Sequence, residues 1–205
     1  MPAQSLPTEA LVLSRRSPTE RFQNYTVFSA EHGLLTVMQR LARQATSSSL
    51  TLDLFDEVGL LLESSNQGRT WFVKEATLIT RHLALGRSYE TLRQASALGA
   101  LIARNSVHEE SRSAVAALLR HAFAAFATSA RPDLVFFKSL YRFARDEGYP
   151  VKQDWFATLP ASDREIVAGL LNRPLAEQAA EPAVVTRLQR RLEDYLRGHT
   201  DILLD

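Results

Sequence analysis

The chain has 205 residues, of which 45% are hydrophobic and 23% charged, and its formal net charge is +1. It contains no cysteine, which excludes disulfides, cysteine-based zinc sites and a cysteine nucleophile. No run of about 18 apolar residues occurs, so we expect no membrane span. The N-terminus lacks the basic and apolar regions of a secretory signal. We therefore expect a cytoplasmic protein, and the length allows one or two domains.

The first 80 residues predict short β-strands. Apolar or alternating runs occur at 10–14, 24–28, 34–38, 50–55, 58–63 and 71–80. Within the second and third runs apolar side chains recur at every other residue, as in a half-buried strand. Gly33 lies between these two runs and can supply the positive φ that a tight hairpin needs. Strands of this length and spacing predict a small barrel.

Beyond Thr80 the apolar residues take the spacing of helices. Expected starts are Ser88 as an N-cap, Glu109, Pro132 at a first helical position, Ser162 in a capping box with Glu165, and a point near Pro182. The helix from Pro132 should bury Phe137, Leu140 and Tyr141 and end at Gly148. The prediction is an α+β protein with a β domain at 1–80 and an all-helical domain at 81–205.

Known catalytic and metal-binding patterns are missing from the sequence. No histidine lies four residues from another on a recognisable helix, and no phosphate-binding loop, dinucleotide fingerprint or G-x-S-x-G motif occurs. Neighbouring acidic residues diverge on a helix or strand, so pairs such as Glu109-Glu110 predict caps and solvated faces. We expect no enzymatic activity, no catalytic residue, no metal and no cofactor.

Basic residues in the predicted β domain are candidates for binding nucleic acid. They are Arg15, Arg16, Arg21, Arg40, Arg43, Arg69 and Lys74. Tyr25, Trp71 and Phe72 lie nearby, and barrels that bind single strands combine a basic groove with aromatic platforms. The alternative is scattered surface arginine, because residues 1–80 carry seven lysines and arginines against eight acidic residues.

The order of these elements resembles the RecO family of bacterial recombination mediators. Residues 10–13, Ala-Leu-Val-Leu, are similar to the family's A-x-V-L, and the Phe-Ser-Ala-Glu-His-Gly turn at 28–33 is similar to T-x-E-x-G. Arg40 and Arg43 stand where the family's K-G-A-R has its lysine and arginine, whereas Leu41 replaces the glycine. Three further segments continue the resemblance to about Val151: 52–55, where Leu54 replaces a proline, 75–76 and 145–151.

The resemblance implies an N-terminal OB-fold barrel followed by a helical domain, in a form without the family's zinc module. It implies a DNA repair and recombination mediator, associated with the nucleoid, that binds single-stranded and duplex DNA and anneals strands. The implied partners are a RecR-type protein and the acidic C-terminal tail of single-strand-binding protein. An adaptor that keeps the fold and its protein contacts but has lost direct DNA binding is the alternative.

A second basic group falls in the region predicted to be helical. Its members are Arg81, Arg87, Arg93, Arg104, Arg112, Arg120, Lys138, Arg142 and Arg145. An apolar pocket rimmed by such cations would suit an acidic, apolar peptide tail. A plain solvated face is the competing interpretation, and the sequence does not decide between the two.

Overall fold

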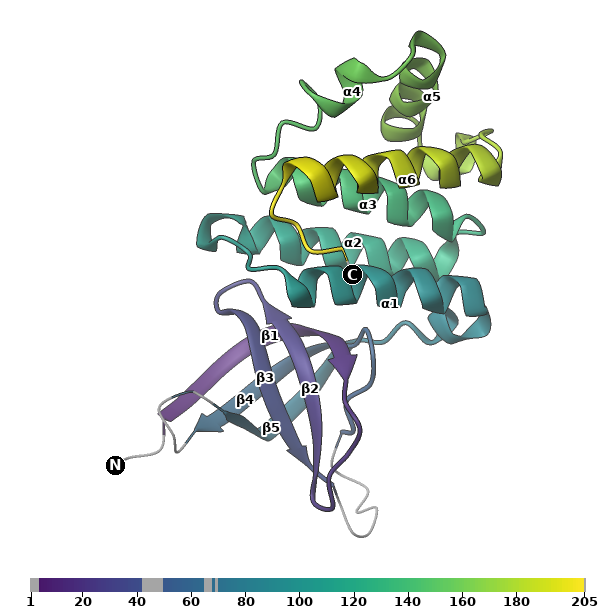
Figure 1. Ribbon diagram of the computed structural model, residues 1–205. Helices are drawn as coiled ribbons and strands as arrows, with labels where there is room; N and C mark the ends of the chain where they lie inside the picture. The colour runs from purple at the N-terminus through teal and green to yellow at the C-terminus, as the bar shows by residue number, and fades with distance from the viewer. Residues whose placement is uncertain (1–3, 42–49, 65–67, 69, 205) are drawn as a thin grey trace. The chain divides into compact units, whose positions relative to one another are not determined.

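The computed structural model describes residues 4–41, 50–64, 68 and 70–204. Five strands come first and helices follow (Figure 1), which confirms the predicted α+β class. The chain divides into two compact units. The barrel unit comprises Met1–His82 and Ser106–Arg120, and the helical unit comprises Leu83–Asn105 and His121–Asp205. Within the part of the chain that the structure describes, no helix is both long and apolar enough to cross a membrane.

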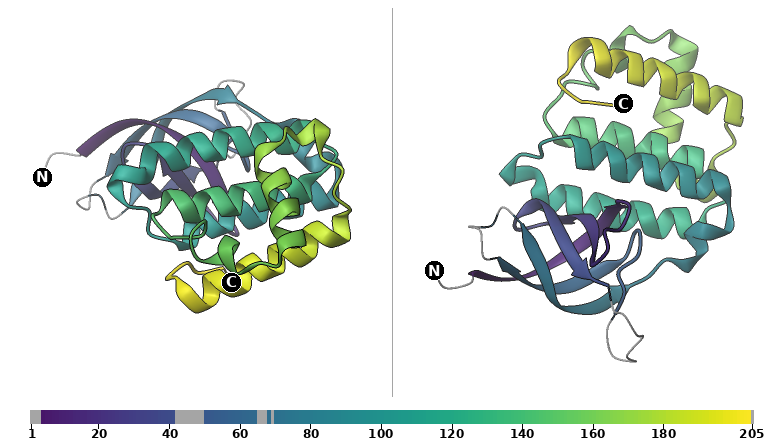
Figure 2. Two further views of the ribbon diagram at one scale, coloured as in Figure 1. Left: turned by 90° about the horizontal axis from the view of Figure 1, so that it is seen from above. Right: turned by 60° about the horizontal axis from the view of Figure 1, so that its bottom comes forward.

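The barrel is a single sheet that closes on itself (Figures 1 and 2). Its strands are β1 (Gln4–Arg15), β2 (Phe22–Ser29), β3 (Gly33–Arg40), β4 (Glu57–Ser64) and β5 (Trp71–Thr80). Their order around the barrel is β1-β2-β3-β5-β4. All neighbours are antiparallel except β3 and β5, which run parallel over a short stretch.

The alternation in the sequence explains which side of each strand faces inward. In β4, Val58, Leu60 and Leu62 are buried, whereas the residues between them are partly exposed. Side chains of this kind from all five strands form the barrel core, which also holds Tyr25 and Trp71. Gly33 has a φ of +69°, in the left-handed region that glycine adopts readily. The tight β2–β3 turn therefore uses glycine as the sequence predicted.

The strand predicted at residues 50–55 is absent, and this prediction is wrong. The segment is a loop with a turn at Leu54–Phe55, where Phe55 has a φ of +67°. Two of its apolar side chains are nevertheless buried, since Leu52 and Phe55 are at most 3% exposed, whereas Leu50 and Leu54 are partly buried. The Tyr25 hydroxyl donates to the Leu52 carbonyl at 2.8 Å, and the Gln39 side chain bonds the backbone of Leu50 and Leu52. The alternation therefore reflects a loop that packs into the barrel core.

The helical elements begin close to the predicted positions. They are η1 (Leu83–Arg87), α1 (Tyr89–Arg104), η2 (Glu109–Ser111), α2 (Arg112–Thr128), α3 (Pro132–Asp146), α4 (Trp155–Thr158), α5 (Ala161–Asn172), η3 (Leu175–Glu177) and α6 (Pro182–His199). The Ser88 side chain caps α1, Pro132 opens α3, and Gly148 follows α3 with a φ of +89°. The first half of α2, through Arg120, belongs to the barrel unit.

The core of the helical unit forms around α3, which contacts α1, α5 and α6. Phe137, Leu140 and Tyr141 are buried, as predicted. The Trp155 ring of α4 lies 6.5 Å from that of Phe137 and 6.1 Å from that of Tyr141. A buried stripe on α6 completes this core: Val185, Leu188, Leu192 and Leu196.

Two predicted helix starts need correction. α5 begins at Ala161 with Pro160 at the N-cap, so the capping box at Ser162 is wrong. Asp163 is instead buried and accepts hydrogen bonds from Arg187 and Arg191 of α6. The second helix starts at Arg112, because Glu109 lies in the short 3-10 turn η2 before it.

Candidate nucleic-acid interface

Four of the predicted cations lie at one end of the barrel. Arg15 ends β1 and pairs in register with Tyr25 near the start of β2, and Arg16 follows directly. At the same end of β2, the Arg21 carbonyl accepts from the Leu41 backbone N–H at 2.8 Å. Phe22 is in register with Arg40, the last residue of β3. We call Arg15, Arg16, Arg21 and Arg40 the cationic end of the barrel.

Most of these cations are free to meet a ligand. Arg16, Arg21 and Arg40 are exposed, and their side chains make no hydrogen bond or ion pair with any residue that the structure describes. The Arg15 guanidinium lies 3.8 Å from the Asp53 carboxylate, and both side chains are at least half exposed. An exposed pair of this kind is weak, so Arg15 can exchange Asp53 for another anion.

The remaining predicted cations do not join this group. Lys74 lies on β5, and its ammonium is 3.4 Å from the Glu63 carboxylate of β4. Arg43 and Arg69 lie outside the described residues. Within residues 4–41 and 50–64, the candidate interface therefore rests on the cationic end.

Two of the aromatic residues expected beside these cations belong to the barrel core. Tyr25 is 1% exposed and Trp71 is 7% exposed, so neither presents a ring face to a base. Burial raises the pKa of the Tyr25 phenol, which keeps its hydroxyl protonated as the donor to Leu52. The expectation that these two rings serve as stacking platforms is wrong, because period-two alternation turns them inward.

An apolar shelf lies beside Arg40, and of its residues only Phe72 was singled out from the sequence. Phe22 is half-buried and packs edge to face against Phe72, with ring centroids 5.5 Å apart. Met38 is in register with Phe72 across the parallel β3–β5 pair. The buried neighbours of these residues point inward, so Phe22, Met38 and Phe72 lie on the outer face of the barrel. Successive side chains of a strand point to opposite faces, so an inward Tyr25 places Phe22 on the outer face. This alternation was the sequence signal that could have revealed the shelf.

Basic residues of the second group are mostly engaged within the chain. Five of these arginines pair with carboxylates: Arg81 with Asp56, Arg93 with Glu90, Arg120 with Glu57, and Arg142 and Arg145 both with Asp146. Backbone carbonyls accept from Arg104, Arg112 and Lys138. Burial also lowers the pKa of Lys138. A cation that is already paired within the chain is less able to bind an acidic peptide than a free cation.

Among the described residues, no cluster of three or more histidine, aspartate or glutamate side chains is suited to hold a metal ion.

Comparison with known proteins identifies no family: no protein-family model matches the chain, and no curated protein matches its sequence. The geometry of the barrel and the free cations at its end are therefore the features that bear on function.

Proposed function

We propose that this chain is a RecO-like recombination mediator whose barrel belongs to the OB-fold class. In this proposal it binds single-stranded and duplex DNA without sequence preference and anneals complementary strands. A RecR-type partner and the tail of single-strand-binding protein would bring it to strands that await recombinase. No covalent bond changes, so the proposal assigns no catalytic residue.

One observation carries the proposal: the free cations lie where OB-fold barrels bind oligonucleotides. In that fold the binding surface is the face of strands 2 and 3 together with the connection between strands 1 and 2. Here Arg16 and Arg21 flank the β1–β2 connection, and Arg40 ends β3. Phe22 and Met38 of the apolar shelf lie on β2 and β3, and Phe72 lies on β5, which pairs with β3.

The chemistry of this end suits a single strand. Guanidinium groups bind phosphates with paired, charge-assisted hydrogen bonds. Every base has an apolar face, so stacking on the half-buried Phe22 and Phe72 would tolerate any sequence. Phosphate contacts position a strand without reading its bases, which agrees with a protein that handles strands of every sequence.

Strand annealing tests this function. Two complementary oligonucleotides with a fluorophore and a quencher should pair faster with the wild-type protein than alone. The Arg21→Ala/Arg40→Ala variant should lose most of this acceleration because it removes two of the three cations at this end that have no partner among the described residues. Arg93→Ala/Arg142→Ala removes the same charge from the helical unit, where both arginines are already paired, and should anneal like wild type. Equal loss in both variants would contradict the proposal.

An adaptor without direct DNA binding is the second candidate function. The engaged arginines of the second group favour it, because among the described residues of that group only the Arg87 side chain makes no hydrogen bond or ion pair with another described residue. In that case the wild-type protein would neither bind nor anneal single strands while still binding its protein partners.

A further inference from the structure

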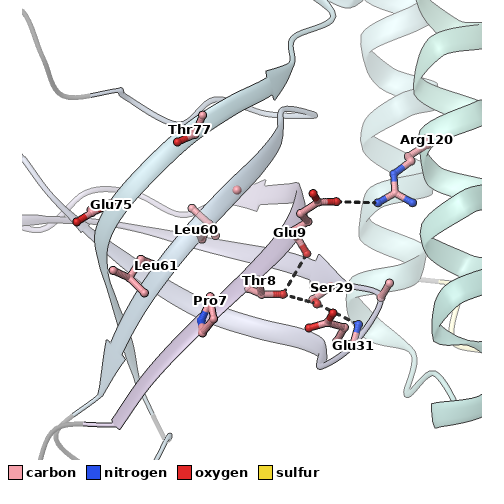
Figure 3. A pocket seen from close by; sticks show the side chains of 12 residues that line it. Pro7, Thr8, Glu9, Ser29, Glu31, Leu60, Leu61, Glu75, Thr77 and Arg120 are labelled. Carbon is pink, nitrogen blue, oxygen red and sulfur yellow. Dashed lines mark hydrogen bonds and ion pairs between the residues drawn. The ribbon is translucent and has the colours of Figure 1, made fainter.

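A groove on the outer face of the barrel lies away from the cationic end. It encloses about 520 Å³ against β1, β4 and β5, all within the barrel unit (Figure 3). The strand registers arrange its floor in two rows, Glu9–Gly59–Thr77 and Pro7–Leu61–Glu75. Their neighbours Val58, Leu60 and Leu62 point into the core, so these rows face outward. We call this the Gly59 groove.

The groove exists because the middle of β4 has no side chain. A Cβ added at Gly59 would meet no atom within 4 Å. Gly59 does not have a positive φ, so its backbone does not require glycine. Glycine weakens a strand interior and often marks a place where a ligand or another backbone approaches closely. The structure thus keeps open a space that a larger residue would fill without strain.

The rim of the groove is acidic. Glu9, Glu31 and Glu75 line it, and Arg120 is the only cation among its described lining residues. Arg120 is engaged, because it bonds Glu57 and lies 3.8 Å from Glu9 (Figure 3). The Glu75 carboxylate has no hydrogen bond or ion pair with any described residue. A phosphate backbone would be repelled here, whereas a cation would be attracted.

We propose that the Gly59 groove binds an arginine or lysine side chain from a basic, extended segment of a partner protein. The alkyl stem of that side chain would lie over Gly59 and Leu61, and its charged head would meet Glu75. Long basic side chains combine an apolar stem with a charged tip. The groove has Gly59 and Leu61 for the stem and the Glu75 carboxylate for the tip. The inference goes beyond the proposed function and does not depend on DNA binding.

A defined peptide tests the groove directly. The probe is a fluorescein-labelled heptapeptide in which arginine alternates with leucine, and its matched partner carries glutamate in place of arginine. Fluorescence anisotropy should show that the full-length protein binds the arginine peptide and not the glutamate peptide. Gly59→Val fills the space where the alkyl stem would lie and so keeps the charged head from Glu75. Binding should weaken at least about tenfold, the loss expected for one charge-assisted hydrogen bond.

Further variants separate the groove from general charge effects. Glu75→Gln should weaken binding of the arginine peptide about tenfold, because it removes the free carboxylate. Glu20→Gln removes the same charge from an exposed site in the β1–β2 connection and should bind the peptide like wild type. Single-strand binding should be unchanged in Gly59→Val and Glu75→Gln, so a failure of the groove is distinguishable from a failure of the proposed function.

Three results would overturn the inference. The first is wild-type protein that does not bind the arginine peptide. The second is peptide binding that Gly59→Val and Glu75→Gln leave unchanged. The third is a wild-type dimer in sedimentation that Gly59→Val dissociates, because the occupant would then be a second copy of this chain.

Discussion

At the scale of single residues, the arginines of this chain fall into two groups that differ in what holds them. Arg81 binds the buried Asp56 through Nε at 2.8 Å and Nη2 at 2.5 Å, and this bond raises the pKa of Arg81. Arg40 has an exposed side chain without such a partner among the described residues. The first arrangement stabilises the fold, whereas the second leaves a charge for a ligand. Equal residue types therefore have different roles, and only the contacts distinguish them.

Asp163 gives a prediction about pH. Its carboxylate is nearly buried and accepts from Arg187 at 2.7 and 2.8 Å and from Arg191 at 2.6 Å. The hydrogen bond from Arg187 above all lowers the pKa of Asp163, and Arg191 adds to this effect. A lowered pKa in the folded state contributes stability that is complete above the ordinary value of about 3.9 and is lost as pH falls through the folded value.

The Asp163→Asn variant should therefore be less stable than wild type at neutral pH, and the difference should shrink as pH falls below about 4. Urea unfolding at neutral pH and at two acidic pH values measures it. Glu165→Gln, at an exposed position two residues further along α5, controls for the loss of a charge and should show no such pH dependence. A difference that stays constant with pH would show that the pairing with Arg187 and Arg191 does not drive the effect.

At the scale of elements, helix α3 has the best-defined stability prediction. Phe137 is fully buried against Trp155. Phe137→Ala should lower the free energy of unfolding by about 3–5 kcal/mol, because it removes apolar contacts and leaves a cavity. Arg142→Ala, on the exposed side of the same helix and paired only with Asp146, should change it by less than about 1 kcal/mol. Thermal or urea unfolding of both variants checks this, and similar small effects would mean that the α3 core is loosely packed.

The same elements show what the sequence could predict. α1 and α3 begin at a serine cap and a proline, and α3 is followed by a glycine with positive φ, so local chemistry marks their ends. The run at 50–55 was wrongly predicted to be a strand, because a partly buried loop and a half-buried strand can show the same alternation of apolar and polar residues. At Ser162 the motif was correct in spacing, but α5 already begins at Ala161 after Pro160, and Asp163 pairs with Arg187 of α6.

The sequence did not reveal the surface features that depend on neighbours in other strands. Phe22 and Phe72 are far apart in the sequence and meet only through the barrel register. Glu9, Gly59 and Thr77 come from three strands, so no local motif could reveal the Gly59 groove. The positions of Arg16, Arg21 and Arg40 in the sequence were known, but their freedom from acidic partners is a tertiary property.

At the scale of the whole molecule, charge is segregated within the barrel unit. The Phe22 end of β2 carries the free cations, whereas the Ser29 end borders the acidic Gly59 groove. A count over residues 1–80 averages these two surfaces and gives a weakly acidic segment. The low net charge therefore does not exclude a local phosphate site, because salt-dependent binding responds to the cations that a strand contacts.

Segregated surfaces also suit a protein that handles a strand and a partner together. The proposed DNA contact uses the cationic end, and the proposed peptide contact uses the opposite end of β2. Variants in one surface should leave the other unchanged, since residues that share no partners act independently.

The most direct test of the account is a salt titration of single-strand binding. Fluorescence anisotropy with a labelled mixed-sequence oligonucleotide gives the slope of log K against log salt for folded wild type, Arg21→Ala/Arg40→Ala and the Arg93→Ala/Arg142→Ala control. We expect the slope to shrink by up to about 1.4 in the first variant, at about 0.7 per lost phosphate contact, and to stay unchanged in the control. An unchanged slope and affinity in Arg21→Ala/Arg40→Ala would contradict the assignment of the cationic end as the DNA-binding surface.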